Sequence, residues 1–292
     1  MATTKERKSF FKKIRGVDSG GDEMSFIEHL EVLRWHLARS AIVLVVIAIA
    51  VFINVDWIFD HIIYAPAQRD FVTYRALCSL SHQLHLGEAL CMPPIDIQLL
   101  GSTVSGPFMS AISISFMCAV VIAFPYLLWE VWRFIKPALS PKELSYARGS
   151  IGWVSLCFFS GAAFGYFLLA PFTFNFLANF QLGNMNVYQY LPTLDDFIGT
   201  LTSLILGCGV AFELPVLAYV LSKLGLITPA FLRTYRKYAY VIILLLAAII
   251  TPSPDWTSQM IVAVPLIFLY ELSIFISKRV DDKRIKEEAQ WD

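Results

Sequence analysis

The sequence predicts an all-α integral membrane protein with six transmembrane helices and with both termini on the cytoplasmic side. Of its 292 residues, 57% are hydrophobic and 16% are charged, whereas soluble domains carry about 25% charged residues. Apolar runs long enough to span a bilayer recur along the chain. Lysine and arginine are confined almost entirely to alternate segments between these runs.

Six segments carry the expected spans, and the last two of them are short. The hydrocarbon core needs about 20 mostly apolar residues of helix, and four segments have that length. Pro252 and Pro254 separate the last two segments, because proline ends a helix and favours a turn. These two segments form either a re-entrant hairpin or two short spans, and both possibilities leave the ends of the pair on one side. The six segments are 37–55, 108–128, 151–172, 197–221, 238–250 and 260–276.

The positions of the basic residues predict the orientation. Of the 23 Lys and Arg residues, all except Arg69 and Arg75 lie in the two terminal segments or in the loops on the same side. Cytoplasmic segments of membrane proteins are enriched in Lys and Arg, so both termini are expected in the cytoplasm. The expected organisation is a polar basic tail at 1–24, a six-span membrane domain at 25–277 and a charged cytoplasmic tail at 278–292.

An amphipathic helix is expected just before the first span. Ser25 and Glu28 form a capping box, in which the serine caps the helix and the glutamate reaches back to it. An apolar stripe at helical spacing follows, made of Phe26, Leu30, Leu33 and Leu37. The helix is expected to lie along the membrane surface. Two interpretations stay open: it is a simple anchor with solvated charges, or Glu28, Glu31 and Arg34 face a ligand.

Four stretches of the chain resemble elements of the TatC family, and they occur in order on the expected six-span frame. They are FIEHLEVLR at 26–34; FPY at 124–126 with WRFIKPAL at 132–139 and then Glu143; GVAFELP at 209–215; and TPSPDWTSQ at 251–259 with AVP at 263–265 and YE at 270–271. The sequence departs from the family pattern at Val32, where the family usually has Glu, and in an additional Ser-Pro step before Asp255. Each stretch alone is weak, but together they span nearly the whole membrane part.

The resemblance implies a cup-like TatC bundle that acts in twin-arginine protein export. Such a protein lies in the bacterial inner membrane, binds Arg-Arg signal peptides of folded cargo at its cytoplasmic face and recruits single-span TatA and TatB proteins. Transport is then driven by the proton-motive force. Further copies of the chain are an additional partner that the sequence leaves open. No nucleic-acid partner, cofactor, metal ion or enzymatic activity is expected.

A set of contact residues for the signal peptide also follows from the resemblance. Carboxylates match the two guanidinium groups of an Arg-Arg motif through paired hydrogen bonds. The expected site comprises Glu28, Glu31, Arg34, Phe134 and Glu143. Taken without the resemblance, Glu143 would be interpreted as a solvated carboxylate beside Lys142.

Glu213 lies deep in the fourth expected span. Roughly 15 Å of helix separates it from Lys223, and a charge at the centre of a span costs about 2.5–3.5 kcal/mol. Its carboxyl group should therefore be uncharged or face a polar cavity. It either bonds to a neighbouring helix or contacts a partner helix or substrate, and the resemblance favours the second role. Pro215 is expected to bend this helix.

Gln259 lies at the outer turn just before the last expected span, and Glu271 lies within that span. The resemblance implies a TatA or TatB contact around Gln259. Glu271 is closer to the cytoplasmic interface and is expected to be mainly structural.

The first outer loop, at about 56–107, contains Cys78, His82, His85 and Cys91. Its compartment permits disulfides. A Cys78–Cys91 disulfide is the expectation, while a zinc site that includes the histidines and a pair of free thiols stay open as alternatives. The remaining cysteines lie in expected spans and should simply pack.

Two other classes of function are weighed against protein export. An ion-coupled secondary transporter that uses Glu213 would need ionisable residues in several spans, and Glu213 is the one expected at depth. An intramembrane enzyme would need a metal or nucleophile motif, and no HExxH or nucleophile–base pattern occurs in the spans. Nucleotide-driven transport is also disfavoured, because the sequence has no Walker A loop.

Overall fold

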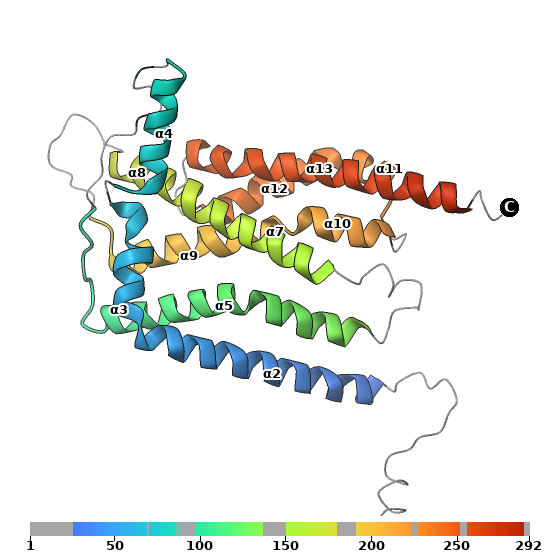
Figure 1. Ribbon diagram of the computed structural model, residues 1–292, viewed down its shortest axis with the longest axis horizontal. Coiled ribbons are helices and arrows are strands. Elements are labelled where there is room, and N and C mark those ends of the chain that lie inside the picture. Colours follow the sequence, from blue (N-terminus) through green and yellow to red (C-terminus); the bar gives the residue numbers. More distant parts are fainter. Residues whose placement is uncertain are drawn as a thin grey trace, which may run out of the picture. The chain divides into compact units, whose positions relative to one another are not determined.

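The computed structural model describes residues 26–68, 70–85, 87, 91, 97–136, 150–179, 191–223, 227–251 and 256–288, and it describes their side chains except at 26–30, 150, 257–258 and 283–288. Most of the described residues are helical (Figure 1). The chain forms two compact units, Met1–Arg39 and Ser40–Asp292. Helix α2 (Phe26–Ile53) begins in the first unit and ends in the second, so the expected amphipathic helix and first span are one continuous helix.

Within the described residues, five helical segments are long and apolar enough to cross a membrane: Glu31–Ile53, Gly106–Ile135, Ile151–Asn179, Leu194–Lys223 and Gln259–Asp282. Four of them belong to the second unit. Their helices are α5 (Gly106–Ile135); α7 (Ser150–Phe164) with the π-helical turn η4 (Gly165–Leu169) and α8 (Ala170–Asn179); α9 (Leu194–Ala211) with α10 (Leu214–Lys223); and α13 (Trp256–Glu288).

The fifth expected span corresponds to a shorter helix. Helix α12 (Arg236–Ile250) has 15 residues, about 22 Å of helix, against a hydrocarbon core of about 30 Å. Helix α13 continues to Glu288, so the segment expected as a charged tail from residue 278 begins inside a helix. The short helix α11 (Pro229–Thr234) precedes α12 and is capped by Thr228, whose Oγ1 accepts a hydrogen bond from the Phe231 amide at 3.2 Å.

The segment expected as a long outer loop is largely helical in its first half. It contains α3 (Val55–Ile58), the π-helical turn η1 (Phe59–Ile63), the 3-10 turn η2 (Ala65–Ala67) and α4 (Val72–Gln83). The second half returns to the bundle at Leu100, whose amide donates to the Pro192 carbonyl at 2.9 Å. The Leu194 amide donates to the Leu100 carbonyl at 3.1 Å, so this segment is fixed to the start of α9.

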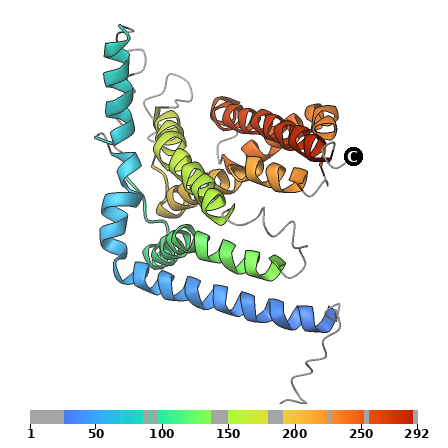
Figure 2. The same ribbon diagram turned by 45° about the vertical axis from the view of Figure 1, so that its right-hand side comes forward.

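Helix α4 is attached to the rest of the second unit through hydrogen bonds at its first turn. Thr73 donates to the Phe167 carbonyl of η4, and the Tyr74 hydroxyl lies 3.1 Å from the carbonyl oxygens of Pro66 and Pro171. Burial raises the pKa of the Tyr74 hydroxyl, so this group remains a hydrogen-bond donor. Figures 1 and 2 both show α4 at the end of the unit where α9 begins and α8 ends.

Glycines let α7 and α9 pack backbone against backbone. A Cβ atom added at Gly161 would lie 2.4 Å from the Cys208 carbonyl oxygen, and one added at Gly165 would lie 2.5 Å from the Leu204 carbonyl oxygen. Small residues at helix interfaces of membrane proteins permit this close approach. Beside them, the buried Phe158 ring stacks on Phe124 of α5, with ring centroids 3.6 Å apart. Helices α5, α7 and α9 therefore share one core.

Helices α10, α12 and α13 form a second packed group within the same unit. The buried Ser222 of α10 donates to the Ser277 hydroxyl of α13 at 2.7 Å. Figures 1 and 2 show α13 on the side of α9 and α10 that faces away from α5. Ile250 joins this group to α9, because its side chain fills the space beside Gly207.

Candidate functional site

The expected contact residues Glu31 and Arg34 are exposed on α2. Arg34 Nη2 lies 3.8 Å from Glu31 Oε1, and the two side chains are 72% and 65% exposed. The Arg34 guanidinium also lies 5.8 Å from the centre of the Trp35 ring. An exposed ion pair contributes little free energy, so Glu31 can exchange Arg34 for another guanidinium group at small cost. Glu28 lies on the same helix, but its side chain is outside the described residues.

The other expected contact residues are Phe134 and Glu143. Phe134 is half-buried in the last turn of α5, next to Arg133, whose guanidinium lies 5.6 Å from the Trp129 ring centre. Glu143 lies outside the described residues. Glu31 belongs to the first compact unit and Phe134 to the second, so the convergence of these residues on one site stays a prediction.

Glu130 is a buried carboxyl group that the sequence reasoning missed. Its side chain is 1% exposed on α5, and Oε1 accepts a hydrogen bond from the Tyr126 hydroxyl at 2.8 Å. Glu130 lies two residues beyond the expected span 108–128 and one turn before Arg133, so packing between helices buries it near the end of α5. The signal that points to Glu130 is its spacing of one helical turn from Tyr126 in an apolar run.

The backbone around Glu213 interrupts the fourth span. Helix α9 ends at Ala211 and α10 begins at Leu214, so Phe212 and Glu213 form a turn between them. The Glu213 amide donates to the Val210 carbonyl at 3.1 Å, which is a tighter turn than an α-helix makes. Pro215 has no N–H group to donate to the Ala211 carbonyl. The expected disturbance of the helix by Pro215 is confirmed.

The Glu213 side chain lies against α7. It is half-buried, and its Oε1 atom is buried with no hydrogen-bond partner among the described residues. The carboxyl group lies near the backbone of Phe158 on α7. A buried oxygen without a partner costs about 1–3 kcal/mol. Glu213 therefore keeps an unused hydrogen-bonding position where α7 meets the break in the fourth span.

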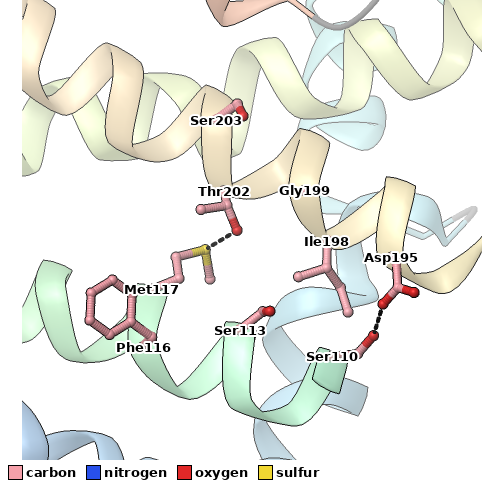
Figure 3. A pocket seen from close by; sticks show the side chains of 9 residues that line it. All are labelled: Ser110, Ser113, Phe116, Met117, Asp195, Ile198, Gly199, Thr202 and Ser203. Carbon is pink, nitrogen blue, oxygen red and sulfur yellow. Dashed lines mark hydrogen bonds between the residues drawn. The ribbon is translucent and has the colours of Figure 1, made fainter. Parts of the chain in front are cut away.

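A groove of about 540 Å³ lies between α5 and α9, at the end where both helices begin (Figure 3). Its wall carries four hydroxyl groups and one carboxylate among apolar side chains. Ser110 donates to Asp195 Oδ1 at 2.6 Å, and Thr202 donates to Met117 Sδ at 3.3 Å. The lining residues are Ser110, Ser113, Phe116, Met117, Asp195, Ile198, Gly199, Thr202 and Ser203. Glu213 is not among them, so the groove and the helix break are separate features.

The amide and carboxyl groups on α13 make bonds within the chain. Gln259 Nε2 donates to the Leu244 carbonyl of α12 at 2.9 Å, so part of its hydrogen-bonding capacity joins α13 to α12. Glu271 accepts from Arg236 Nη2 at 2.8 Å and from the Tyr240 hydroxyl. These contacts agree with a structural role for Glu271. The expected partner contact at Gln259 stays a prediction.

The structure joins Cys78 of α4 to Cys91 through a disulfide, with an S–S distance of 1.93 Å. Cys118, Cys157 and Cys208 are free thiols within the spans. His82 lies beside the disulfide, with its Nδ1 atom 3.9 Å from Cys78 Sγ.

Comparisons with known proteins agree with the architecture. The family model for "Sec-independent protein translocase protein (TatC)" matches residues 28–265. The chain belongs to the TatC family. The TatC protein of Blattabacterium sp. subsp. Periplaneta americana is 38% identical over 268 residues, which cover 90% of this chain and 98% of that protein. The TatC protein of Helicobacter pylori (strain J99) is 46% identical over 173 residues, which cover 59% of this chain and 68% of that protein.

A solved structure shares the fold. The crystal structure of the twin-arginine translocase receptor TatC in the detergent DDM matches with a TM-score of 0.68 and 31% sequence identity, covering 86% of this chain and 99% of that one. With the apolar helices, these matches make the chain an all-α, multi-pass protein of the bacterial inner membrane and a component of the Tat protein translocase. The resemblance inferred from the four sequence stretches is thereby confirmed.

Proposed function

We propose that this chain is the receptor that binds the Arg-Arg signal peptides of folded cargo at the cytoplasmic face of the membrane. The observation that carries the proposal is the similarity to TatC proteins over nearly the whole chain, which includes a solved structure described as the translocase receptor. The exposed carboxylate of Glu31 supports it, because its partner Arg34 is easily replaced by a ligand guanidinium.

The binding site comprises Glu28, Glu31 and Arg34 on α2, together with Phe134 in the last turn of α5 and Glu143, which follows it in the sequence. The carboxylates pair with the two guanidinium groups of the signal peptide, and Phe134 supplies an apolar contact. Paired hydrogen bonds between arginine and a carboxylate are geometrically specific, so lysine in the signal peptide is a poor substitute.

The chain crosses the membrane six times, with both termini in the cytoplasm. The short helix α12 is the fifth crossing, and α13 is the sixth. The support is the segregation of basic residues, which leaves only Arg69 and Arg75 on the outer side. Hydrogen bonds from Gln259 and to Glu271 support α12 and α13 as a firmly joined pair.

Single-span proteins of the TatA and TatB type bind within the membrane at Glu213 and around Gln259. Glu213 supports this role, because its buried Oε1 atom has no partner among the described residues. A polar group on a partner helix would satisfy that oxygen. Transport is driven by the proton-motive force.

The test is capture of the purified full-length chain by two signal peptides that differ in one dipeptide, Arg-Arg against Lys-Lys. The expected result is clear retention by Arg-Arg and weak retention by Lys-Lys. Equal retention by both peptides would refute guanidinium recognition. Crosslinkers placed beside the Arg-Arg pair should react at α2 and at segment 137–149, and reaction confined to the opposite end of the helices would refute the proposed face.

A further inference from the structure

Cys78, His82 and Cys91 form a cluster of three metal-ligating side chains at the end of α4. Cys78 and His82 are one helical turn apart, so their side chains lie on the same face of the helix. The chain beyond α4 brings Cys91 to this face. One ring nitrogen of His82 and the two sulfur atoms all lie within 4.8 Å of one another. Two sulfurs and an imidazole are ligands that Zn²⁺ prefers.

The Nδ1 atom of the His82 ring faces the cluster, because it lies 3.9 Å from Cys78 Sγ. The same atom lies 2.8 Å from the Cys78 carbonyl oxygen, to which Nδ1–H can donate. A neutral imidazole carries its proton on either ring nitrogen. When the proton resides on Nε2, Nδ1 gives up this hydrogen bond and its lone pair is available to a metal ion.

The turn after α4 is held by contacts other than the disulfide. Ser81, which is fully buried, donates to the Gly87 carbonyl at 2.7 Å. His85 and Gly87 adopt the left-handed backbone conformation, with φ angles of 56° and 63°. Backbone geometry and this hydrogen bond therefore hold Gly87 beside α4. Cys91 should stay near Cys78 when the disulfide is reduced.

We propose that this cluster is a redox-switched Zn²⁺ site, which binds the ion when Cys78 and Cys91 are thiols and releases it when they form the disulfide. In the reducing step a dithiol donates two electrons and two protons, cleaves the S–S bond and leaves as its own disulfide. Zn²⁺ then binds both sulfurs as thiolates, together with His82, and the two thiol protons are released. Water fills the fourth position of the tetrahedron.

The two redox states thus provide two alternative cross-links between α4 and the chain that follows it. The disulfide joins them covalently, and the metal ion joins the same two residues through its coordination. The site does not depend on the direction in which the chain crosses the membrane, or on signal-peptide binding. Its test is therefore independent of the proposed receptor function.

The experiment uses the full chain purified in detergent, divided into a phosphine-reduced and an oxidised sample. Equilibrium dialysis against Zn²⁺, followed by metal analysis, should show about one ion more per chain in the reduced sample. His82→Asn should weaken this binding roughly tenfold or more. His85→Asn is the matched control, because His85 lies in the same turn but outside the cluster, and asparagine tolerates its left-handed backbone. The control should bind like the wild type.

Three results would overturn the proposal. The first is equal Zn²⁺ binding by the reduced and oxidised wild type, a comparison that needs no substitution. The second is equal affinity of the reduced His82→Asn and His85→Asn variants. The third is undiminished binding by the reduced Cys78→Ser/Cys91→Ser variant, which would assign the ion to Cys118, Cys157 or Cys208 instead. Thiolate-to-metal absorption with Co²⁺, present in the reduced wild type alone, would support the proposed ligands.

Discussion

Gly161 of α7 lies so close to Cys208 of α9 that a Cβ atom on the glycine would meet the cysteine carbonyl oxygen at 2.4 Å. The obstructing atom belongs to the backbone, so it cannot rotate away as the end of a side chain would. Gly165 repeats the contact one turn later, against the Leu204 carbonyl oxygen. Because glycine has no Cβ atom, these two positions allow α7 and α9 to pack this closely. The position of the helix break at Glu213 depends on the same close packing.

Gly161→Ala should therefore destabilise the protein by about 1–3 kcal/mol, the usual range for overpacking a tight contact. Gly152→Ala is the matched control on the same helix, because an added Cβ atom there has no neighbour within 4 Å among the described residues. Alanine is the better helix former by about 1 kcal/mol, so the control should be neutral or slightly stabilising. Thermal unfolding of both variants in one detergent measures the difference. Equal midpoints would show that the interface can relax.

Many of the transmembrane helices were predictable from the sequence, because each span requires a continuous run of about 20 mostly apolar residues. The break near Glu213 was also predictable, since Pro215 removes a specific backbone donor. The length of α13 was not, because charged residues from Lys278 onward signal the end of an apolar run and not the end of a helix.

The sequence did not predict features that arise from packing between distant segments of the chain. The burial of Glu130 depends on how α5 packs, and the same local sequence is compatible with an exposed carboxylate. The groove between α5 and α9 brings together Ser110 and Asp195, which lie far apart in the sequence. Asp195 alone is typical of the first turn of a helix, where a negative charge is favourable. Nothing local distinguishes it from Asp196.

The orientation can be tested by thiol labelling of intact cells. Cysteine substituted at Ser140 or Thr228 should be protected from an impermeant reagent, whereas cysteine at Asn186 should be labelled. The reason is the concentration of Lys and Arg in the segments around Ser140 and Thr228. The wild type, with its disulfide and its three thiols within the spans, serves as the blank. Labelling in the reverse pattern would invert the topology and move every proposed cytoplasmic contact to the other face.

Signal-peptide affinity should fall when Glu143 loses its carboxylate. A paired, charge-assisted contact contributes about 1.5–3 kcal/mol, so Glu143→Ala should weaken binding by roughly ten- to a hundredfold. Glu271→Gln is the control, because it removes a carboxylate that already pairs with Arg236 and Tyr240. Titration of a labelled Arg-Arg peptide compares the two variants. If Glu143→Ala binds like the control, Glu143 does not belong to the site.

The two acidic residues of the N-terminal helix should share one role. Val32 stands where TatC sequences usually have Glu, so Glu28 and Glu31 each supply part of the negative charge near that position. Replacing both with alanine should weaken signal-peptide binding more than either single replacement, while Val32→Ala should have little effect. The same peptide titration measures all four proteins. A single variant as weak as the double one would assign the contact to that residue alone.

Substitutions at Glu213 should distinguish signal-peptide binding from export of the folded cargo. Its side chain lies between α7 and the helix break, and Oε1 is buried without a partner among the described residues. A buried oxygen without a hydrogen bond destabilises the folded chain by about 1–3 kcal/mol. This cost indicates that the oxygen accepts a hydrogen bond when another molecule is bound. A passing helix of a TatA-type partner, or the inserted signal peptide, would offer the missing hydrogen bond.

Glu213→Gln should therefore keep the fold and much of the transport, because the amide retains an oxygen acceptor and adds a donor at the same place. Glu213→Ala should still insert and should bind the signal peptide at the cytoplasmic face with nearly wild-type affinity, since that face lies roughly 15 Å of helix away. Its export of a folded cargo should be impaired, which a cell-fractionation assay measures alongside the amount of inserted protein. Loss of insertion in the alanine variant would make Glu213 a structural residue, and the glutamine variant would then separate a packing role from a hydrogen-bonding one. Normal export by Glu213→Ala would remove Glu213 from the transport step and leave its buried oxygen without a role in a partner contact.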